Sequence, residues 1–150
     1  MQKITVRRKI NAPLDEVRGA LWRIKDWAQF WAPLHKVEIF YDDGVHQDFT
    51  MFLEWQAVDT HVRTVRFLDA KGNISFFSPT PPLLMSVHQG VWELSSDQGY
   101  TELAAVRYFE LPYQEKETTE EYNCRLGIFS KGFEERLTSL LERLGELCEK

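Results

Sequence analysis

The chain has 150 residues, a length typical of one domain, so we expect a single domain over residues 1–150. Its hydrophobic content of 43% and aromatic content of 13% exclude a disordered protein. A formal net charge of −5 disfavours a nucleic-acid binder, which usually presents a basic face. No signal-peptide core and no apolar run of ~18 residues is present, so we expect a cytoplasmic protein without stable membrane insertion.

The first part of the chain predicts one strand followed by two short helices. Residues 3–11 alternate between apolar and polar side chains, which is typical of a half-buried strand. A helical apolar stripe follows over residues 13–24. Asp26 is predicted to cap a second short helix, which Pro33 ends.

The rest of the chain predicts a sheet and one long helix. Two-residue alternations separated by turn sequences indicate five or six further strands in an antiparallel meander, with a loop over residues 79–82. Residues 114–121 are polar and predict a mobile connection, after which an amphipathic helix runs over about residues 122–149. We therefore predict an α+β fold in which a curved antiparallel sheet of six to seven strands wraps around the C-terminal helix. Such a sheet leaves room for a mostly apolar small molecule.

The usual catalytic signatures are absent. There is no GxGxxG, Walker loop, HExxH, CxxC or GxSxG sequence. The four histidines show no metal-ligand spacing, so we expect neither a metal site nor a cofactor.

One arginine, Arg107, alternates in sequence with apolar residues and so is expected on the apolar face of its strand. In the last strand, Arg107 shares a face with Leu103, Ala105 and Phe109. If that face points inward, the guanidinium needs a carboxylate, a wet cavity or an anionic ligand, because burying it unpaired is prohibitive. The alternative is a structural ion pair, or a side chain that reaches solvent at the strand end.

Other candidates are less well placed by pattern alone. Arg66 lies in a strand that has an arginine on each face, so alternation does not decide which one turns inward. His88 shares a face with Gly90 and Trp92, and is either a satisfied core residue or an acid–base group. The tryptophans of the chain belong either to the core or to a lined pocket.

Four strings carry a family resemblance: NAP at 11–13, IKDW at 24–27, GVWEL at 90–94 and GYTEL at 99–103. In this order and spacing the chain resembles the START-like, Bet v 1-like (SRPBCC) superfamily with the helix-grip fold. Within that superfamily it is most similar to the polyketide cyclase/aromatase and dehydrase group. The resemblance spans essentially the whole chain.

The resemblance implies a cavity between the sheet and the long helix that holds an apolar or aromatic molecule. Proteins of this group fold a poly-β-ketone, often delivered on an acyl carrier protein, and promote aldol cyclisation and dehydration. Their pocket arginine corresponds to Arg66 and their pocket tryptophan to Trp27. Their pocket tyrosine falls near Leu34, beside His35, and their helix asparagine falls near Gly132, so the chain departs from the group at these two positions.

We therefore predict a polyketide cyclase/aromatase-like protein. The alternatives are a non-catalytic carrier of a lipid, quinone or other hydrophobic metabolite, and an interaction module whose own aromatic residues fill the space. A monomer and a homodimer are both compatible with the sequence. The candidate catalytic residues are Arg66, His88, Arg107 and His35. The candidate ligand contacts are Trp27, Trp31, Phe49, Met51, Trp55, Trp92, Phe129 and Phe133.

Overall fold

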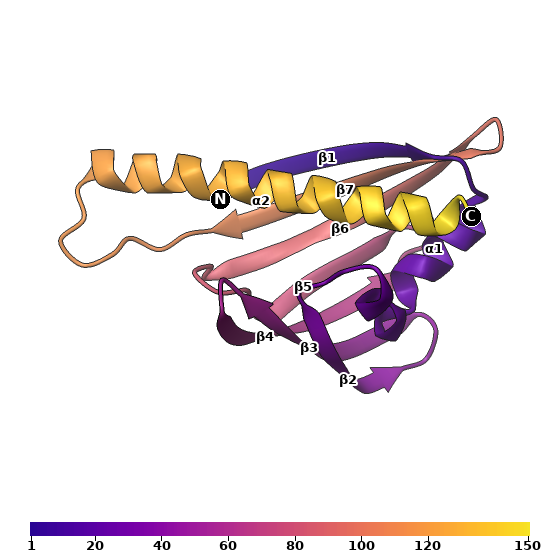
Figure 1. The fold of residues 1–150 in the computed structure, drawn as a ribbon, viewed down its shortest axis with the longest axis horizontal. Coiled ribbons are helices and arrows are strands. Elements are labelled where there is room, and N and C mark those ends of the chain that lie inside the picture. Colours follow the sequence, from indigo (N-terminus) through magenta and orange to yellow (C-terminus); the bar gives the residue numbers. More distant parts are fainter.

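A seven-stranded antiparallel sheet curves around a long C-terminal helix in the computed structural model, which describes residues 1–150 (Figure 1). The strands are β1 (Gln2–Ile10), β2 (Leu34–Asp42), β3 (His46–Trp55), β4 (Val58–Leu68), β5 (Ile74–Thr80), β6 (Val87–Asp97) and β7 (Tyr100–Glu110). The helices are α1 (Leu14–Trp22), the 3₁₀-helix η1 (Ile24–Gln29) and α2 (Thr119–Cys148). This arrangement confirms the predicted α+β helix-grip fold, with two short helices after the first strand.

The sheet order is β1-β7-β6-β5-β4-β3-β2. Strands β2 to β7 follow one another as a meander, as their alternating patterns predict. Strand β1 is the exception, because it pairs along its whole length with β7 at the far end of the chain. None of the helices is long and apolar enough to cross a membrane.

Two helix starts differ from the prediction. The 3₁₀-helix begins at Ile24, so Asp26 lies in its first turn and is not its cap. Helix α2 begins at Thr119, earlier than predicted, because the Thr118 side chain caps it. The Thr118 hydroxyl accepts a hydrogen bond from the Glu121 amide at 3.1 Å and donates one to the Glu121 carboxylate at 3.0 Å.

The predicted loop over residues 79–82 is shorter than expected, because β5 continues through Pro79 to Thr80. The β4–β5 pairing shifts its register between Arg63 and Val65, close to this proline. A register shift is one of the few places in a sheet where a residue without an N–H breaks no regular pair. A prediction based only on the prolines of residues 79–82 therefore ends β5 too early.

The fully buried residues of α2 all lie in its second half. Its buried residues are Leu137, Leu140, Leu141, Leu144 and Gly145, and the helix packs mainly on β1 and α1. Its first turns project past the end of β7 (Figure 1). Ile128, which we expected on the apolar stripe, is consequently 72% exposed.

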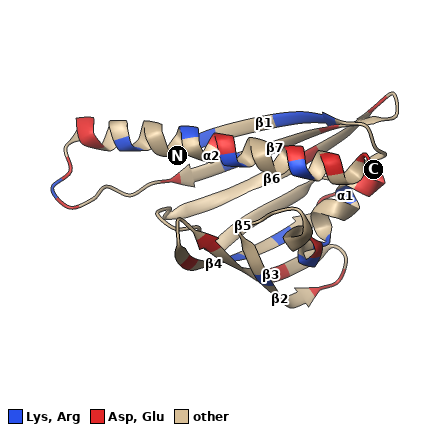
Figure 2. Ribbon diagram, in the orientation of Figure 1, with Lys and Arg blue, Asp and Glu red and all other residues tan.

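Basic residues follow β1 along the sheet edge (Figure 2). Lys3, Arg7 and Lys9 point outward and are exposed, whereas Arg8 turns toward α2. A Cβ at Gly145 would overlap the Arg8 guanidinium, so glycine at this position lets the strand and helix approach closely. Helix α2 therefore packs closely on the sheet at the β1 edge, together with α1. Toward the β2 edge, the inner face of the sheet is not covered closely by the helix.

Candidate functional site

A cavity of about 810 Å³ lies between the inner face of the sheet and α2. Hydrophobic residues make up 19 of the 33 residues that line it, and its volume is that of a small-molecule site. All eight predicted ligand contacts line this cavity: Trp27, Trp31, Phe49, Met51, Trp55, Trp92, Phe129 and Phe133. The aromatic residues therefore form walls and do not fill the space, which argues against the interaction-module interpretation.

The two buried arginines lie in one row that crosses the inner face of the sheet. Paired residues on successive strands place Gln47 beside Arg66, Arg66 beside Phe76, Phe76 beside Gly90, and Gly90 beside Arg107. We call these five residues the arginine row. Because residues in register point to the same face, both guanidiniums turn toward α2. The strand register thus decides the orientation of Arg66, which its own alternation left open.

Gly90 is the gap in the arginine row. A Cβ at this position would overlap the Val106 carbonyl oxygen and would lie 3.1 Å from the Phe76 ring. Since no side chain occupies the gap, the Arg107 side chain can lie across β6. Its Cζ is 4.6 Å from the Phe76 ring centroid and 4.2 Å from that of Trp92.

Arg107 has almost no partner within the chain. It is 5% exposed, takes part in no ion pair, and makes a single hydrogen bond, from Nη1 to the Val106 carbonyl at 3.1 Å. The only fully enclosed side-chain nitrogen or oxygen that lacks a partner is Arg8 Nε, so the remaining Arg107 donors face the cavity. Burial, together with the charge of Arg66, lowers the pKa of Arg107 to about 9, which leaves it charged at neutral pH.

Arg66 is buried too, but it is largely committed to the fold. Its Nε donates to Gln47 Oε1 at 2.6 Å, and its Nη2 donates to the carbonyls of Leu21 at 2.7 Å and Trp22 at 2.8 Å. These carbonyls belong to the last turn of α1, where carbonyl groups lack helical partners and a cation is favoured. Burial lowers the pKa of Arg66 to about 9, while the nearby Asp42 carboxylate acts in the opposite direction. Arg66 therefore holds α1 against the sheet as well as lining the cavity.

Replacing Arg66 is expected to cost stability as well as any activity. Arg66→Met leaves the Leu21 carbonyl and Gln47 Oε1 without their donor, whereas the Trp22 carbonyl keeps the one from Gln47 Nε2, and we expect a loss of about 3 kcal/mol in the free energy of unfolding. Urea unfolding measures this loss. Arg63→Met on the outer face of the same strand is the control, because Arg63 pairs with Asp48 at the surface, where solvent screens an ion pair. Equal urea unfolding midpoints for the two variants would contradict the structural role of Arg66.

His88 stands beside Arg107 on the inner wall. Its Nδ1 lies 3.0 Å from the Ser78 hydroxyl, which in turn lies 3.0 Å from the Thr64 hydroxyl. Its ring is 5.0 Å from that of Phe76. Burial, with a contribution from the Arg107 charge, lowers the pKa of His88 to about 3, so the ring is neutral at pH 7.

The neutral state of His88 makes stability depend on pH. The unfolded histidine takes up a proton below its ordinary pKa of 6.5, whereas the folded one stays neutral down to about 3. The His88 contribution to stability is therefore complete above pH 6.5 and is lost as the pH falls from there toward 3. Its limiting slope is about 1.4 kcal/mol per pH unit. Urea unfolding of the wild type and His88→Phe from about pH 7.5 to about pH 4.5 should show the shallower slope in the variant. Parallel slopes would mean that His88 is protonated in the folded protein.

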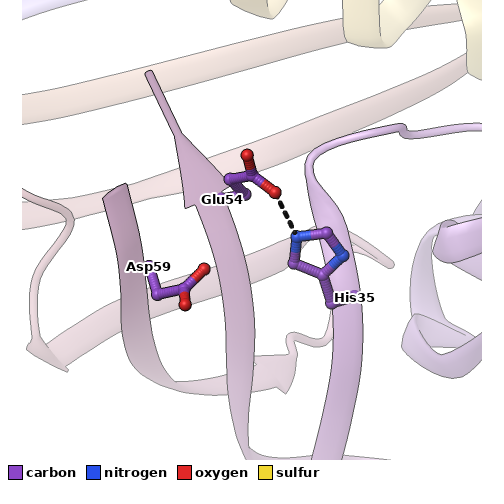
Figure 3. A group of neighbouring side chains, drawn as sticks. All are labelled: His35, Glu54 and Asp59. Atoms are coloured by element: carbon purple, nitrogen blue, oxygen red, sulfur yellow. Dashed lines mark hydrogen bonds and ion pairs between the residues drawn. The ribbon is translucent and has the colours of Figure 1, made fainter. Parts of the chain in front are cut away.

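His35 does not reach the cavity, so the structure does not support its predicted catalytic role. Leu34 points into the core, and the neighbouring His35 therefore points outward. The His35 ring is exposed and pairs with Glu54 at 3.2 Å, close to Asp59 on the next strand (Figure 3). The possible ligand atoms of these three side chains lie within 4.8 Å of one another, a grouping that histidine spacing in the sequence did not indicate.

Several residues of the site were not predicted from the sequence. Thr64 and Ser78 share the inward phase of Arg66 and Phe76, and this phase could have identified them. Arg136 lies on α2, with its Cζ 4.0 Å from the Trp55 ring centroid. The cavity is lined by five cationic and two acidic side chains, although the whole chain has a net charge of −5. The cationic residues are Arg66, Arg107, Arg136, Arg143 and Lys150, and the acidic ones are Glu54 and Glu146.

No protein-family model matches the chain, and no curated protein matches it. Solved structures do. TTHA0849 from Thermus thermophilus has a TM-score of 0.81 at 16% identity, over 97% of this chain and 95% of that one. The ZhuI aromatase/cyclase from Streptomyces sp. R1128 has a TM-score of 0.83 at 18% identity, over 99% and 93% of the two chains.

A START superfamily protein from Mycobacterium smegmatis is more distant, with a TM-score of 0.66 at 12% identity over 95% and 98% of the two chains. Identities this low establish the fold alone. That fold is the helix-grip fold of the START-like proteins and the aromatase/cyclases, as the sequence strings predicted.

Proposed function

We propose that the chain binds an apolar molecule of the poly-β-ketone type in its cavity and promotes aldol cyclisation and dehydration. One observation carries this proposal: a charged guanidinium, that of Arg107, faces an apolar cavity without an ion-pair partner, next to a neutral histidine. The likeness in fold to an aromatase/cyclase structure supports it. In this proposal the substrate is delivered on an acyl carrier protein.

Each part of the site has a physical role in such a reaction. In aldol closure an acidic carbon between two carbonyls loses its proton to solvent water, and the resulting enolate carbon bonds to a distant ketone carbon. The alkoxide formed there takes up a proton, and dehydration then releases that oxygen as water. A fixed cation in a water-poor cavity stabilises the charge on the enolate oxygen. Arg107 provides that cation, since the stacked Phe76 and Trp92 rings hold its guanidinium in place. The aromatic walls hold a flexible chain in a folded conformation, which lowers the entropic cost of ring closure.

Turnover of a synthetic poly-β-ketone thioester tests the proposal directly. Such compounds cyclise without a catalyst into mixtures, so we expect the protein to accelerate the reaction and to favour one cyclised, dehydrated product. Mass spectrometry of timed samples measures both effects, and His61→Phe, altered at an exposed position outside the cavity, is the matched control. A product mixture and rate identical to those without protein would refute the enzyme proposal.

A carrier of a hydrophobic metabolite is the second candidate. It is favoured by the scarcity of acid–base groups at the inner wall, where His88 is the only histidine that lines the cavity. Native mass spectrometry of the protein as purified distinguishes the two candidates. A stoichiometric bound lipid or quinone together with absent turnover would favour the carrier, and an empty protein with turnover would favour the enzyme.

A further inference from the structure

The hydroxyl groups behind His88 indicate which of its ring nitrogens carries the proton. Thr64 and Ser78 are 6% and 2% exposed, and each is hydrogen bonded only within the chain Thr64–Ser78–His88. If Thr64 donates to Ser78 and Ser78 donates to Nδ1, both buried hydroxyl protons are used inside the protein. In the opposite direction the Thr64 proton has no acceptor in the chain and can be given only to a molecule in the cavity, which Thr64 lines.

The first direction leaves Nδ1 as an acceptor and puts the ring proton on Nε2. Nε2 has no partner within the chain and is not fully enclosed, and His88 lines the cavity. A neutral histidine in this tautomer offers an N–H to whatever occupies the cavity. At neutral pH it is then a hydrogen-bond donor, and it is not poised to accept a proton from a ligand through Nε2.

His88 and Arg107 offer their donors at the same place. His88 is two residues from Gly90 on the inner face of β6, and Arg107 lies across that gap. Both side chains contact the Phe76 ring, His88 at 5.0 Å and Arg107 at 4.6 Å from its centroid. No carboxylate stands nearby to pair with them, because the two acidic residues of the lining, Glu54 and Glu146, pair with His35 and Arg143.

We infer that this pair of donors is a receptor for an anionic oxygen, and that the cavity takes an apolar molecule carrying a carboxylate or enolate group. Arg107 supplies the counter-charge and His88 a directed N–H, while the aromatic walls take the apolar body. This inference rests on the proposed function, whose ligand it specifies by charge. Ligands whose only charge is positive are disfavoured, and neutral ones keep a hydrogen bond from Arg107 but lose the charge–charge attraction.

The tautomer can be measured without any ligand. In long-range ¹H–¹⁵N spectra of the ¹⁵N-labelled protein, the coupling pattern of a neutral ring distinguishes an Nε2 proton from an Nδ1 proton. The His88 signals are identified by their absence in His88→Phe. We expect the Nε2–H pattern, and an Nδ1–H pattern would overturn the role of His88 as a donor.

The charge of the ligand is tested by calorimetry with naphthoate, naphthamide and naphthylmethylammonium, which share one apolar body. We expect naphthoate to bind at least roughly tenfold more tightly than the amide. Arg107→Met should abolish that preference, His88→Phe should weaken it, and His88→Gln, which keeps an N–H donor, should partly restore it. His61→Phe should leave the preference unchanged. Benzoylacetone, followed by the absorbance of its enolate, shows whether an enolate is bound as a carboxylate is.

The outcomes separate this inference from the proposed function. Equal affinity for naphthoate and naphthamide would overturn the anion receptor and leave an apolar cavity that binds small molecules. Tight binding of the ammonium would do the same. Absence of binding for all naphthalene probes would overturn both the receptor and the proposed ligand cavity.

Discussion

Arg107→Met should remove function while leaving the protein at least as stable as the wild type. Loss of a preorganised cation that stabilises developing negative charge typically lowers turnover by about 10²-fold or more. The same guanidinium is buried without a carboxylate, so methionine, an unbranched apolar side chain, removes a desolvation cost. We expect the free energy of unfolding to rise by about 1 kcal/mol or more. Timed turnover of a poly-β-ketone thioester and urea unfolding measure the two effects.

The contrast with the other arginine of the row makes this prediction specific. Arg66→Met is expected to lose stability, because Arg66 donates to α1, whereas Arg107 donates only to the Val106 carbonyl. An Arg107→Met variant that unfolds more readily than the wild type would mean that Arg107 has a structural partner. Turnover unchanged in that variant would remove Arg107 from the proposed mechanism.

Gly90→Ala should be among the most destabilising single substitutions in the chain, with an expected loss of more than about 4 kcal/mol. The added Cβ overlaps the Val106 carbonyl oxygen, which belongs to the backbone of the neighbouring strand and cannot rotate away. Relief requires β6 and β7 to separate, and their pairing is the longest in the sheet. Urea unfolding, or failure to obtain folded protein, measures the effect.

Gly127→Ala is the matched control for this substitution. Gly127 lies in α2, where a Cβ would meet nothing within 4 Å. Alanine is favoured over glycine inside a helix, so we expect a gain of about 0.5–1 kcal/mol. A Gly90→Ala variant that unfolds within about 1 kcal/mol of the wild type would show that the strands can yield at this point.

Much of the fold could be predicted from local pattern, because each strand has its own two-residue alternation. The phase of the last strand put Arg107 on the same face as apolar neighbours and left open whether that face points inward, which the structure shows that it does. The strand predictions needed only the alternation of apolar and polar residues that are neighbours in sequence. The seven-stranded sheet and the long helix confirm them.

What could not be predicted depends on contacts between distant segments. Arg66 occupies a strand with an arginine on each face, and its partners are α1 carbonyls, one of them 45 positions away in sequence. The role of Gly90 depends on the position of the Val106 carbonyl on the next strand. His35 was assigned from an adjacent motif position, yet its side chain points to the opposite side from Leu34. Register and curvature, which no short window of sequence contains, decide each of these cases.

The pairing of β1 with β7 has a consequence for how the protein is made. Gln2 pairs with Phe109 and Ile10 with Thr101, so the first strand to be translated finds its partner among the last. Until β7 is made, β1 has no strand to pair with on either side. Helix α2, which follows β7 in the chain, cannot yet cover the inner face of the sheet. We therefore expect the nascent chain to remain open until most of it has left the ribosome, and refolding to be slow for its size, since closing contacts of such long sequence separation is costly.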